Sequence, residues 1–416
     1  MAARLLGLVL LALFLLAMAG CGLVDEPVQE ECGPEKETRS INVRFSMSPN
    51  KTGSSTLTRG SDGLLTRTDP EDHEEVPSDF IYEDAIDIFT KDFAIYAFDE
   101  KGICSFSSKA SEEEMTVFGS PTTGYLVNTY IANMEVDKLA DNVTFTIAVL
   151  ANLQSAGGNY PDIEVGTTTL SDLESTTGMN PVFSLPVTTG KGWYPGDVKE
   201  DGTTCFIPMY GRRTFTVPKT AFGDPEGGAQ LYELGSVPLL RALAKVEIID
   251  AIDKVDGQDY PGIEAVSIYD FRRDGYLIPN GFTENTQVKD VTLPQNLVTV
   301  GEANAWPMKK LTGEKTIAYD ENNNEIKKSV DFWRIYIPEL SLAVSKPVFS
   351  VRLRSAADVY EDRTIRLADY STPFSSKIMR NHIYRVAVMN LKAETTLVYT
   401  VCPWDGEYEI NPPAFE

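Results

Sequence analysis

The sequence of 416 residues has only two histidines, His73 and His382, and its five cysteines form no CxxC pair. So few histidines leave little room for a histidine-based catalytic triad, a zinc centre or haem ligation. Positive charge is also scarce, because 37 Lys and Arg stand against 61 Asp and Glu, a formal net charge of −24. A chain this acidic, with no concentrated basic patch, repels phosphate backbones, which excludes nucleic acid as a partner. We therefore expect no enzyme, no metal site and no cofactor.

Four of the cysteines, Cys32, Cys104, Cys205 and Cys402, are widely spaced and have no neighbouring histidine. This spacing is typical of neither a metal site nor a disulfide framework. Cys104 and Cys402 fall within or beside strand-like segments, so we expect them to be small buried hydrophobic residues. One incidental disulfide stays open as the alternative.

Long apolar runs are absent except at the start, where Leu5 to Met18 follows Arg4. These 14 residues are fewer than the ~20 that a spanning helix needs, and residues 1–20 are typical of a secretory signal. Met18-Ala19-Gly20-Cys21 resembles a bacterial lipobox, although Met18 replaces the more common Leu, Val or Ile. We expect lipidation of Cys21, which becomes the new N-terminus; ordinary cleavage with an unmodified cysteine is the alternative.

Residues 21–39 are rich in Glu and Pro without an apolar period, which predicts an acidic tether between the membrane and a folded body. Alternation of apolar and polar residues then predicts a half-buried strand, with one face formed by Ile41, Val43, Phe45 and Met47.

The stretch 48–78 is polar and contains Arg59 and Arg67. A loop of that length in a compact domain needs an explanation. It is either a disordered surface insertion or a processing loop offered to an Arg-specific protease, since cleavage occurs at exposed, flexible segments.

Short strand-like runs recur along the rest of the chain, among them Phe93 to Phe98, Val143 to Leu150 and Ile383 to Met389, and helical periodicity is scarce. The pattern predicts an all-β protein of two antiparallel β-sandwich domains in tandem. A loop-like composition at 221–235 places the boundary there, giving domains 40–235 and 236–416, and the second set of strands begins with Val237 to Ile249.

The C-terminus is expected to form a hairpin arm, because Leu397 to Cys402 is strand-like and Asp405-Gly406 is a turn signal. The residues of this arm that would enter a neighbouring subunit are Leu397, Tyr399, Val401 and Trp404. The alternative is that the hairpin closes the edge of the second sandwich.

Two other patterns favour ordinary structure. Residues 320–325 begin like a calcium loop, but Glu325 stands where such a loop needs Gly, so a polar hairpin turn is expected. Trp333 is expected in the core, whereas Trp193, in a turn-rich loop, is the better surface candidate.

Several motifs, taken in order, resemble one family. Residues 238–247 (PLLRALAKVE) resemble the L-x-R-A-x-A-K-V stretch of fimbrillins, and residues 379–386 (MRNHIYRV) resemble their R-N-x-x-Y-x-V run. Shorter matches are Phe98-Asp99 with Gly102, Val149-Leu150-Ala151-Asn152, Pro208-Met209-Tyr210-Gly211, Tyr336-Ile337-Pro338-Glu339 and Val401-Cys402-Pro403-Trp404. With the lipobox, the chain is similar to the fimbrillin (FimA-like) family of fimbrial subunit lipoproteins over nearly its whole length.

This resemblance implies two transthyretin-like β-sandwich domains, export to the cell outer membrane as a lipoprotein, and assembly into fimbriae for adhesion and biofilm formation, without catalysis. In stalk subunits of the family an Arg-specific protease cuts after the first strand, and the C-terminal segment of another subunit fills the groove. Here residues 41–47 match the displaced strand and Arg59 or Arg67 matches the cut. The implied partners are other fimbrial subunits, the membrane through the lipid on Cys21 before processing, and the protease; a host or bacterial surface receptor stays open.

A physical argument supports the exchange. Burial of four large apolar side chains at about 1.5–3 kcal/mol each represents roughly 6–12 kcal/mol, which an incoming strand recovers. The prediction fails if the first strand is held at both edges in the middle of a sheet with no route for a replacement.

The position in the fibre stays open. A processed structural or adhesive subunit is preferred, and a subunit that keeps its lipid as an anchor is the alternative. A glycan-binding or glycan-hydrolysing surface lipoprotein, with Trp193 as its contact residue, is the rival from a different class.

Overall fold

The fold is taken from a computed structural model, which describes the chain from Arg39 to Pro403 with gaps. The described residues are 39–49, 57–59, 65–67, 92–109, 117–119, 128–136, 142–186, 192–199, 202, 204–218, 231–254, 256–282, 291, 293–294, 299–319, 325–366, 377–390 and 396–403. All of them belong to one compact unit, Arg39–Glu416. No helix within these ranges is both long and apolar enough to cross a membrane. The expected signal peptide and the lipidation site Cys21 lie outside the described residues.

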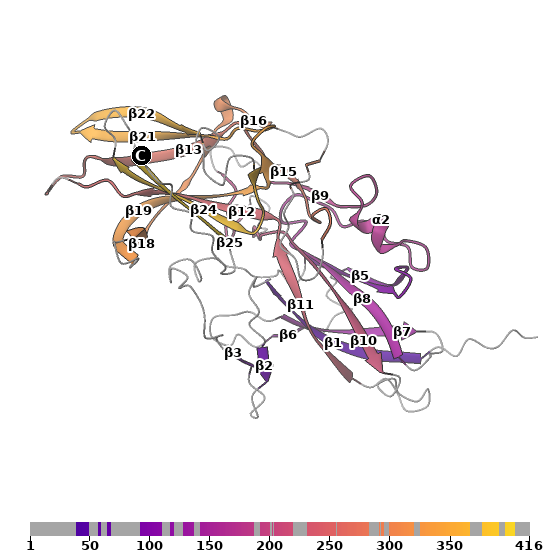
Figure 1. Ribbon diagram of the computed structural model, residues 1–416. Coiled ribbons are helices and arrows are strands. Elements are labelled where there is room, and N and C mark those ends of the chain that lie inside the picture. Colours follow the sequence, from indigo (N-terminus) through magenta and orange to yellow (C-terminus); the bar gives the residue numbers. More distant parts are fainter. Residues whose placement is uncertain are drawn as a thin grey trace, which may run out of the picture. The chain divides into compact units, whose positions relative to one another are not determined.

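Strands dominate the described part of the chain, so the predicted all-β class is confirmed (Figure 1). Within the ranges just given, the helical elements are one short α-helix, α2 (Leu170–Glu174), and one 3-10 turn, η3 (Glu302–Asn304). The strands are β1 (Arg39–Pro49), β2 (Leu57–Arg59), β3 (Leu65–Arg67), β4 (Phe93–Asp99), β5 (Cys104–Lys109), β6 (Val117–Gly119), β7 (Asn128–Val136), β8 (Asn142–Ala151), β9 (Val182–Ser184), β10 (Met209–Pro218), β11 (Leu231–Arg241), β12 (Leu243–Asp250), β13 (Gly262–Tyr269), β14 (Phe271–Arg272), β15 (Asp274–Tyr276), β16 (Thr299–Val300), β17 (Trp306–Pro307), β18 (Lys309–Tyr319), β19 (Glu325–Pro338), β20 (Leu340–Ser341), β21 (Val348–Ala356), β22 (Val359–Arg366), β23 (Lys377–Ile378), β24 (His382–Asn390) and β25 (Thr396–Pro403).

The largest sheet has eight strands in the order β5-β4-β8-β10-β11-β1-β7-β6. Its pairs are antiparallel except for β1 and β11, which run parallel. The period of two is clear in β8, where Phe145 and Ile147 are buried while Thr144 and Thr146 face the other way. The hydroxyl of Thr146 shares a hydrogen bond of 2.9 Å with that of Thr214 on β10. Alternation therefore sets both the core face and the polar face of this sheet.

Two further sheets form the second sandwich. One has five strands in the order β18-β19-β12-β24-β25, and the other has four in the order β17-β13-β21-β22. Buried residues of both sheets, such as Val246 on β12 and Phe349 on β21, belong to one hydrophobic cluster. The antiparallel sandwich organisation is confirmed, with β12 and β24 as a parallel pair within it.

The same cluster continues into the first part of the chain, where it includes Trp193 and Phe183. Hydrogen bonds also join the two parts: the Asn180 side chain donates to the Ile278 carbonyl oxygen at 2.7 Å and accepts from the Ile278 N–H at 3.1 Å. Strand β9 pairs with β15 nearby. Several polar and apolar contacts therefore hold the two parts together.

The expected strand from Val237 to Ile249 is wrong as a single element. It divides at Ala242, so that β11 belongs to the eight-stranded sheet, between β10 and β1, and β12 is the central strand of the five-stranded sheet. The backbone N–H of Ala242 bonds to the Pro208 carbonyl oxygen, which holds the chain at the point where it passes between sheets. The domain boundary between residues 235 and 236 stays a prediction.

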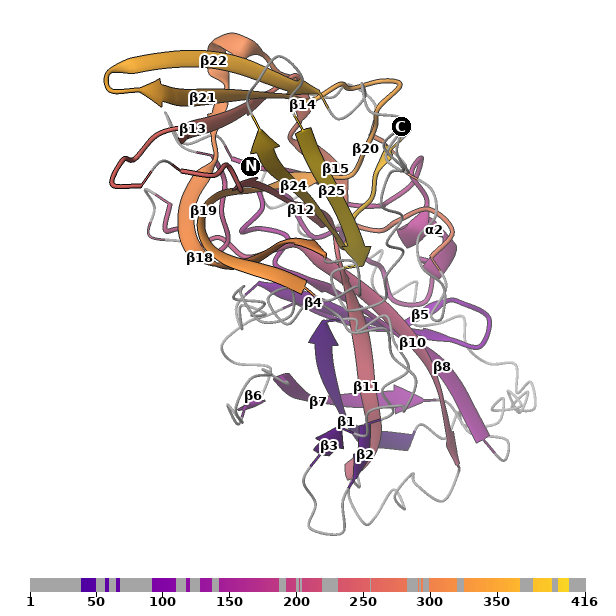
Figure 2. The same ribbon diagram turned by 60° about the vertical axis from the view of Figure 1, so that its left-hand side comes forward.

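Residues 320–324, the expected polar turn, lie outside the described residues. The strands on either side, β18 and β19, form an antiparallel hairpin with Tyr319 opposite Glu325. Figure 2 shows that both arms of this hairpin curve strongly.

Candidate assembly site

Strand β1 lies between its two neighbours, β11 and β7, and not at a sheet edge. Its Val43 is opposite Ala132 of β7 in an antiparallel ladder and opposite Tyr232 of β11 in a parallel ladder. The predicted displaceable residues all fall within β1, namely Ile41, Val43, Phe45 and Met47. Their side chains are outside what the structure describes. Removal of β1 therefore breaks two strand ladders. Strand exchange is excluded if the first strand is held at both edges and no route is open to a replacement strand, and the first of these two conditions is met.

Strand β1 also joins β7 to the rest of its sheet. In the described residues β7 is otherwise paired only with β6, through the short stretch Asn128 to Tyr130. On the other side, β11 pairs with β10 only at Leu240 and Arg241, while residues 231–239 run along β1. Without β1, the pair β6 and β7 has no ladder to the other strands of the sheet.

The two arginines expected at the protease site lie on two short strands, β2 and β3, that pair with each other in an antiparallel ladder. Arg59 ends β2 and is opposite Leu65, and Arg67 ends β3 and is opposite Leu57. Both arginines follow β1 by fewer than twenty residues of sequence. A cut at either position leaves β1 on a separate N-terminal fragment.

The expected donor strand is β25, at the edge of the five-stranded sheet. Leu397 is opposite Val388 and Tyr399 is opposite Val386, both on β24. In the part of the chain that the structure describes, β24 is the only neighbour of β25. Val401 lies in the same strand, whereas Trp404 and the expected second arm of the hairpin lie outside the described residues. Leaving the sheet costs β25 one ladder.

Fully buried Glu247 on β12 lies among cations from its neighbouring strands. Its Oε1 accepts a hydrogen bond of 2.6 Å from Nη2 of Arg334, and its Oε2 accepts one of 3.1 Å from Nε of Arg385. Nζ of Lys315 lies 3.8 Å from Oε1. Burial by itself raises the pKa of the Glu247 carboxyl, but the opposing charges of Arg385, Arg334, Lys315 and Lys245 hold that pKa well below its usual range. Glu247 therefore ties β18, β19 and β24 to the central strand.

A second buried pair fixes the turn before β24. Nε of Arg380 donates to Oε2 of Glu339 at 2.8 Å, and Nη2 donates to Oε1 at 2.8 Å. The same guanidinium donates to the carbonyl oxygens of Leu277 and Tyr276 at 2.6 and 2.7 Å. This two-point geometry is the one that the arginine fork favours. It joins the end of β19 to the segment after β15.

The next residue of this turn completes the link between the two longest motifs. Asn381 has φ 55°, and its N–H donates to the Leu243 carbonyl oxygen at 2.8 Å. Its Oδ1 accepts a hydrogen bond of 3.0 Å from Nη1 of Arg241. The motifs at 238–247 and 379–386 are therefore packed against each other through parallel strands β12 and β24.

Two shorter motifs have similar structural roles. Asn152 has φ 61°, and its Nδ2 donates to the Ile207 carbonyl oxygen at 2.8 Å. A Cβ at Gly211 would overlap the Pro238 carbonyl oxygen on β11, so only glycine permits this approach of β10 and β11.

The sequence analysis did not predict the buried ion pairs of Glu247 and Glu339. Charged residues inside an apolar strand, such as Lys245 and Glu247 in LAKVEIID, were a usable signal for the first of them.

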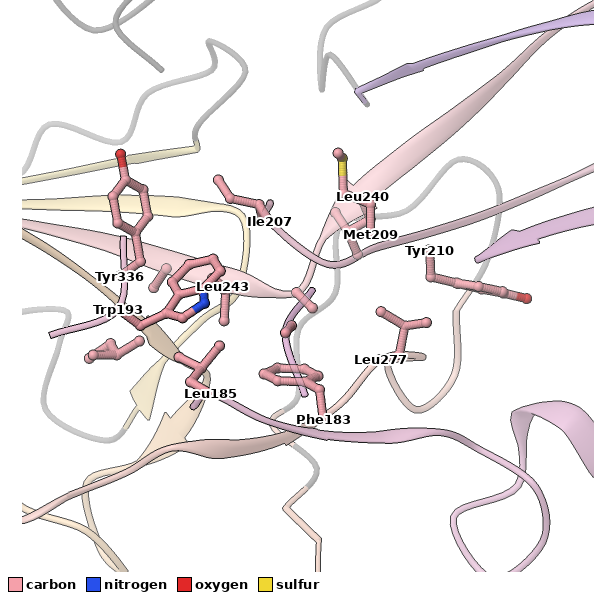
Figure 3. Close-up of a cluster of buried hydrophobic side chains, with 14 of the residues drawn as sticks. Phe183, Leu185, Trp193, Ile207, Met209, Tyr210, Leu240, Leu243, Leu277 and Tyr336 are labelled. Atoms are coloured by element: carbon pink, nitrogen blue, oxygen red, sulfur yellow. The ribbon is translucent and has the colours of Figure 1, made fainter. Parts of the chain in front are cut away.

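The expectation that Trp193 is a surface residue is wrong. Its side chain is only 2% exposed and packs edge to face on Tyr336, with 6.5 Å between ring centroids. Figure 3 shows it near Leu185 and Leu243. The loop is drawn inward because the hydroxyl of its neighbour Tyr194 donates to the Pro307 carbonyl oxygen at 2.6 Å. The glycan-binding rival therefore loses its contact residue.

Other expectations about buried residues hold. Trp333 is buried in the core, as predicted. Cys104 is a buried free thiol, as predicted, and Cys205 is also buried. The side chain of Cys402 is outside what the structure describes. Within the described ranges, no group of His, Cys, Asp and Glu could hold a metal ion.

One polar cavity, of about 250 Å³, lies beside the β18–β19 hairpin and includes Asp250 and Asp331 among its lining residues. Asp250 accepts backbone hydrogen bonds from Ile252 and Ile263, and burial raises the pKa of its carboxyl. Asp331 accepts a hydrogen bond of 2.7 Å from the Thr312 hydroxyl. Both carboxylates are therefore engaged in holding local structure.

The strands and the buried ion pairs define an all-β protein of packed, mainly antiparallel sheets. The sequence motifs supply residues that hold these strands and turns together. No family model matches the chain, and no curated protein sequence matches it. Solved structures that it is similar to include a fimbrial assembly protein from Parabacteroides distasonis, with 11% identity and a TM-score of 0.44 over 88% of this chain and 96% of that one. Two others come from Porphyromonas gingivalis. The C-terminally truncated tip fimbrial protein Mfa3 has 12% identity and a TM-score of 0.41 over 88% of this chain and 100% of that one. The fimbrial anchor protein Mfa2 has 12% identity and a TM-score of 0.32 over 88% and 98%.

Proposed function

We propose that this protein is a structural or adhesive subunit of a cell-surface fimbrium of the fimbrillin type. It is exported as a lipoprotein on Cys21, cut after Arg59 or Arg67, and polymerised by strand exchange. The proposal rests on the sequence motifs and on the strand ladders, because structural likenesses this distant carry no weight for function. Catalysis has no part in it.

The observation that carries the proposal is that β1 directly precedes the segment with both arginines, so that a cut there separates β1 from the rest of the chain. The position of β1 between β7 and β11 counts against exchange only if no route is open to a replacement strand. A strand held at two edges does not leave while it is covalently part of the chain, because release breaks both ladders and exposes the strands beside it. A cut after β1 makes its departure irreversible once the fragment diffuses away. The uncut subunit is thus a stable monomer.

The same two ladders favour a replacement strand. Each backbone hydrogen bond that it restores contributes about 0.5–1.5 kcal/mol net, and it fills the apolar slot as well. The strand best placed to supply this is β25, because it gives up only one ladder, that with β24, within the described residues. Exchange of a singly paired strand into a doubly paired slot is therefore downhill.

The test is a double variant, Arg59→Ala with Arg67→Ala, expressed in the native host. We expect export and folding as in the wild type but no polymer on gels of unheated surface fractions. Arg363→Ala, which removes an exposed arginine on β22, is the matched control and should polymerise normally. Normal fibres from the double variant would refute cleavage as the switch.

N-terminal sequencing of the surface-exposed form shows whether the protein is a processed stalk or tip subunit of the fibre or its lipid-retaining anchor. A start after Arg59 or Arg67 supports a processed stalk or tip subunit. A blocked, lipidated Cys21 on the mature form favours the anchor instead, in which β1 stays in place.

A further inference from the structure

The two neighbours of β1 have opposite directions relative to it. β7 is antiparallel to β1 and β11 is parallel to β1, so β7 and β11 are antiparallel to each other. Antiparallel strands pair directly through perpendicular hydrogen bonds. Departure of β1 therefore leaves two edges that can bond to one another.

The register of these two edges is already matched through β1. Ala132 and Tyr232 are both opposite Val43, and Ile131 and Glu233 are both opposite Arg44. Along a strand, the backbone groups of successive residues point alternately to one neighbour and to the other. Residues on β7 and β11 that share a partner on β1 consequently have matching orientations. In every second such set the backbone groups of both residues point into the gap, and in the sets between them both point away from it. For residues 231–233 of β11, pairing in this register keeps each residue on its own face of the sheet. Beyond Arg44 the ladder with β11 has a bulge, because Phe45 is opposite Gly235, so the paired strands would keep that bulge.

We infer that, once β1 has left, β7 moves sideways by one strand spacing and pairs with β11, so that the subunit closes its own slot. This inference rests on the proposed function, because it concerns the subunit after the release of β1. The movement is about 4.8 Å. Nothing in the ladders opposes it, because β7 keeps only its short pairing with β6 in the residues that the structure describes.

The closed state competes with polymerisation. It restores one ladder, and an incoming β25 also gains one net, because it restores two but gives up the one with β24. What favours the polymer at equilibrium is therefore the filling of the apolar slot. Closure is intramolecular and does not wait for an encounter, and a closed subunit must reopen before it accepts a partner. Cut subunits kept apart from others should thus assemble more slowly than freshly cut ones.

The test uses the full chain with two introduced cysteines, Ala132→Cys and Tyr232→Cys. In the intact protein these positions are two strand spacings apart, about 9.5 Å, beyond the roughly 7 Å between Cα atoms that a disulfide can bridge. In the closed state they are directly opposite, at about 4.5–5.5 Å. A second variant, Ile131→Cys with Glu233→Cys, samples the other kind of antiparallel pair. A control, Val136→Cys with Ser236→Cys, places the thiols out of register, because the residue of β7 that shares the partner Ser46 with Ser236 is Thr129 and not Val136.

Each variant is cut with an Arg-specific protease, exposed to mild oxidant, and analysed by peptide mapping so that native cysteines are distinguished. In cut chains that have released residues 39–49, we expect a disulfide between positions 132 and 232 or between positions 131 and 233, and none in the control pair. Intact chains should form neither disulfide, and a peptide of residues 39–49 added before oxidation should prevent both. Release of the segment without either disulfide overturns the inference alone. Retention of the segment after the cut overturns the proposed function and the inference together, because no slot opens.

Discussion

Arg380 and Glu339 form a two-point ion pair, with 2.8 Å from Nε to Oε2 and 2.8 Å from Nη2 to Oε1, and each side chain is only 1% exposed. The pair joins the turn before β24 to the end of β19. Nη1 and Nη2 of Arg380 also donate to the carbonyl oxygens of Leu277 and Tyr276, so the guanidinium is bonded to protein groups in a buried site. Removal of the Glu339 carboxylate should therefore lower the free energy of unfolding.

We predict that Glu339→Ala lowers the free energy of unfolding by about 3–5 kcal/mol, because it leaves a buried guanidinium without its carboxylate. Urea denaturation followed by tryptophan fluorescence measures the change. The control is Glu361→Ala, which removes the partner of Arg363 in an exposed pair and should cost about 0–1 kcal/mol. Equal effects of the two substitutions would contradict the role given to the buried pair.

Glu247 should make stability depend on pH in the acid range. The pKa of its carboxyl is held well below the usual value in the folded protein, so below about pH 4.3 the unfolded state binds the proton more readily. Its stabilising contribution is thus complete above that pH and is lost as the pH falls towards the folded-state pKa. Glu247→Gln should destabilise the protein most at pH 7, and the difference from wild type should shrink on acidification.

This difference must be taken between variant and wild type at each pH, because other carboxyls titrate in the opposite sense. Burial raises the pKa of Glu174 and that of Asp250, so each of these groups adds stability as the pH falls. Urea midpoints at several values from pH 7 to pH 3 provide the measurement. A difference that is constant over this range would exclude the ionised carboxylate of Glu247 as the source.

Gly211→Ala should disrupt the contact between β10 and β11. Its Cβ would overlap the carbonyl oxygen of Pro238, which is backbone and cannot rotate away, so we expect a loss of at least about 1–3 kcal/mol. Gly301→Ala is the control, because a Cβ there meets nothing within 4 Å. Thermal unfolding of the two variants should separate them, and a neutral Gly211→Ala would show that the strands are not so close.

Trp193→Ala should reduce stability by about 3–5 kcal/mol, because it empties a large buried site beside Tyr336. Val198→Ala, at a position 65% exposed in the same loop, should change it little. Both proteins are then presented to a polysaccharide panel below their unfolding temperatures. Glycan binding lost in folded Trp193→Ala alone would reinstate the glycan-binding rival.

Local pattern predicted much of this fold. The strand-like residues 143–150 correspond to β8, whose first half alternates because a period of two is a property of the strand itself. The continuous apolar run at 93–98 corresponds to β4, in which all six of these residues are buried. The same reasoning failed for residues 237–249, where the run of apolar residues continues through Ala242 although the chain changes sheets. It failed again for Trp193, since turn residues around a tryptophan do not show what covers its ring.

The sequence by itself determined the strand content, the face on which each residue of a regular strand lies, and the presence of charged residues inside apolar strands. Only the tertiary structure decided that Ala132 and Tyr232 flank Val43, and that Arg334, Arg385 and Lys315 surround Glu247. The physical reason is range. Alternation acts between residues two positions apart, whereas these ladders and ion pairs join residues that are far apart in the sequence, so they depend on how all the sheets pack together.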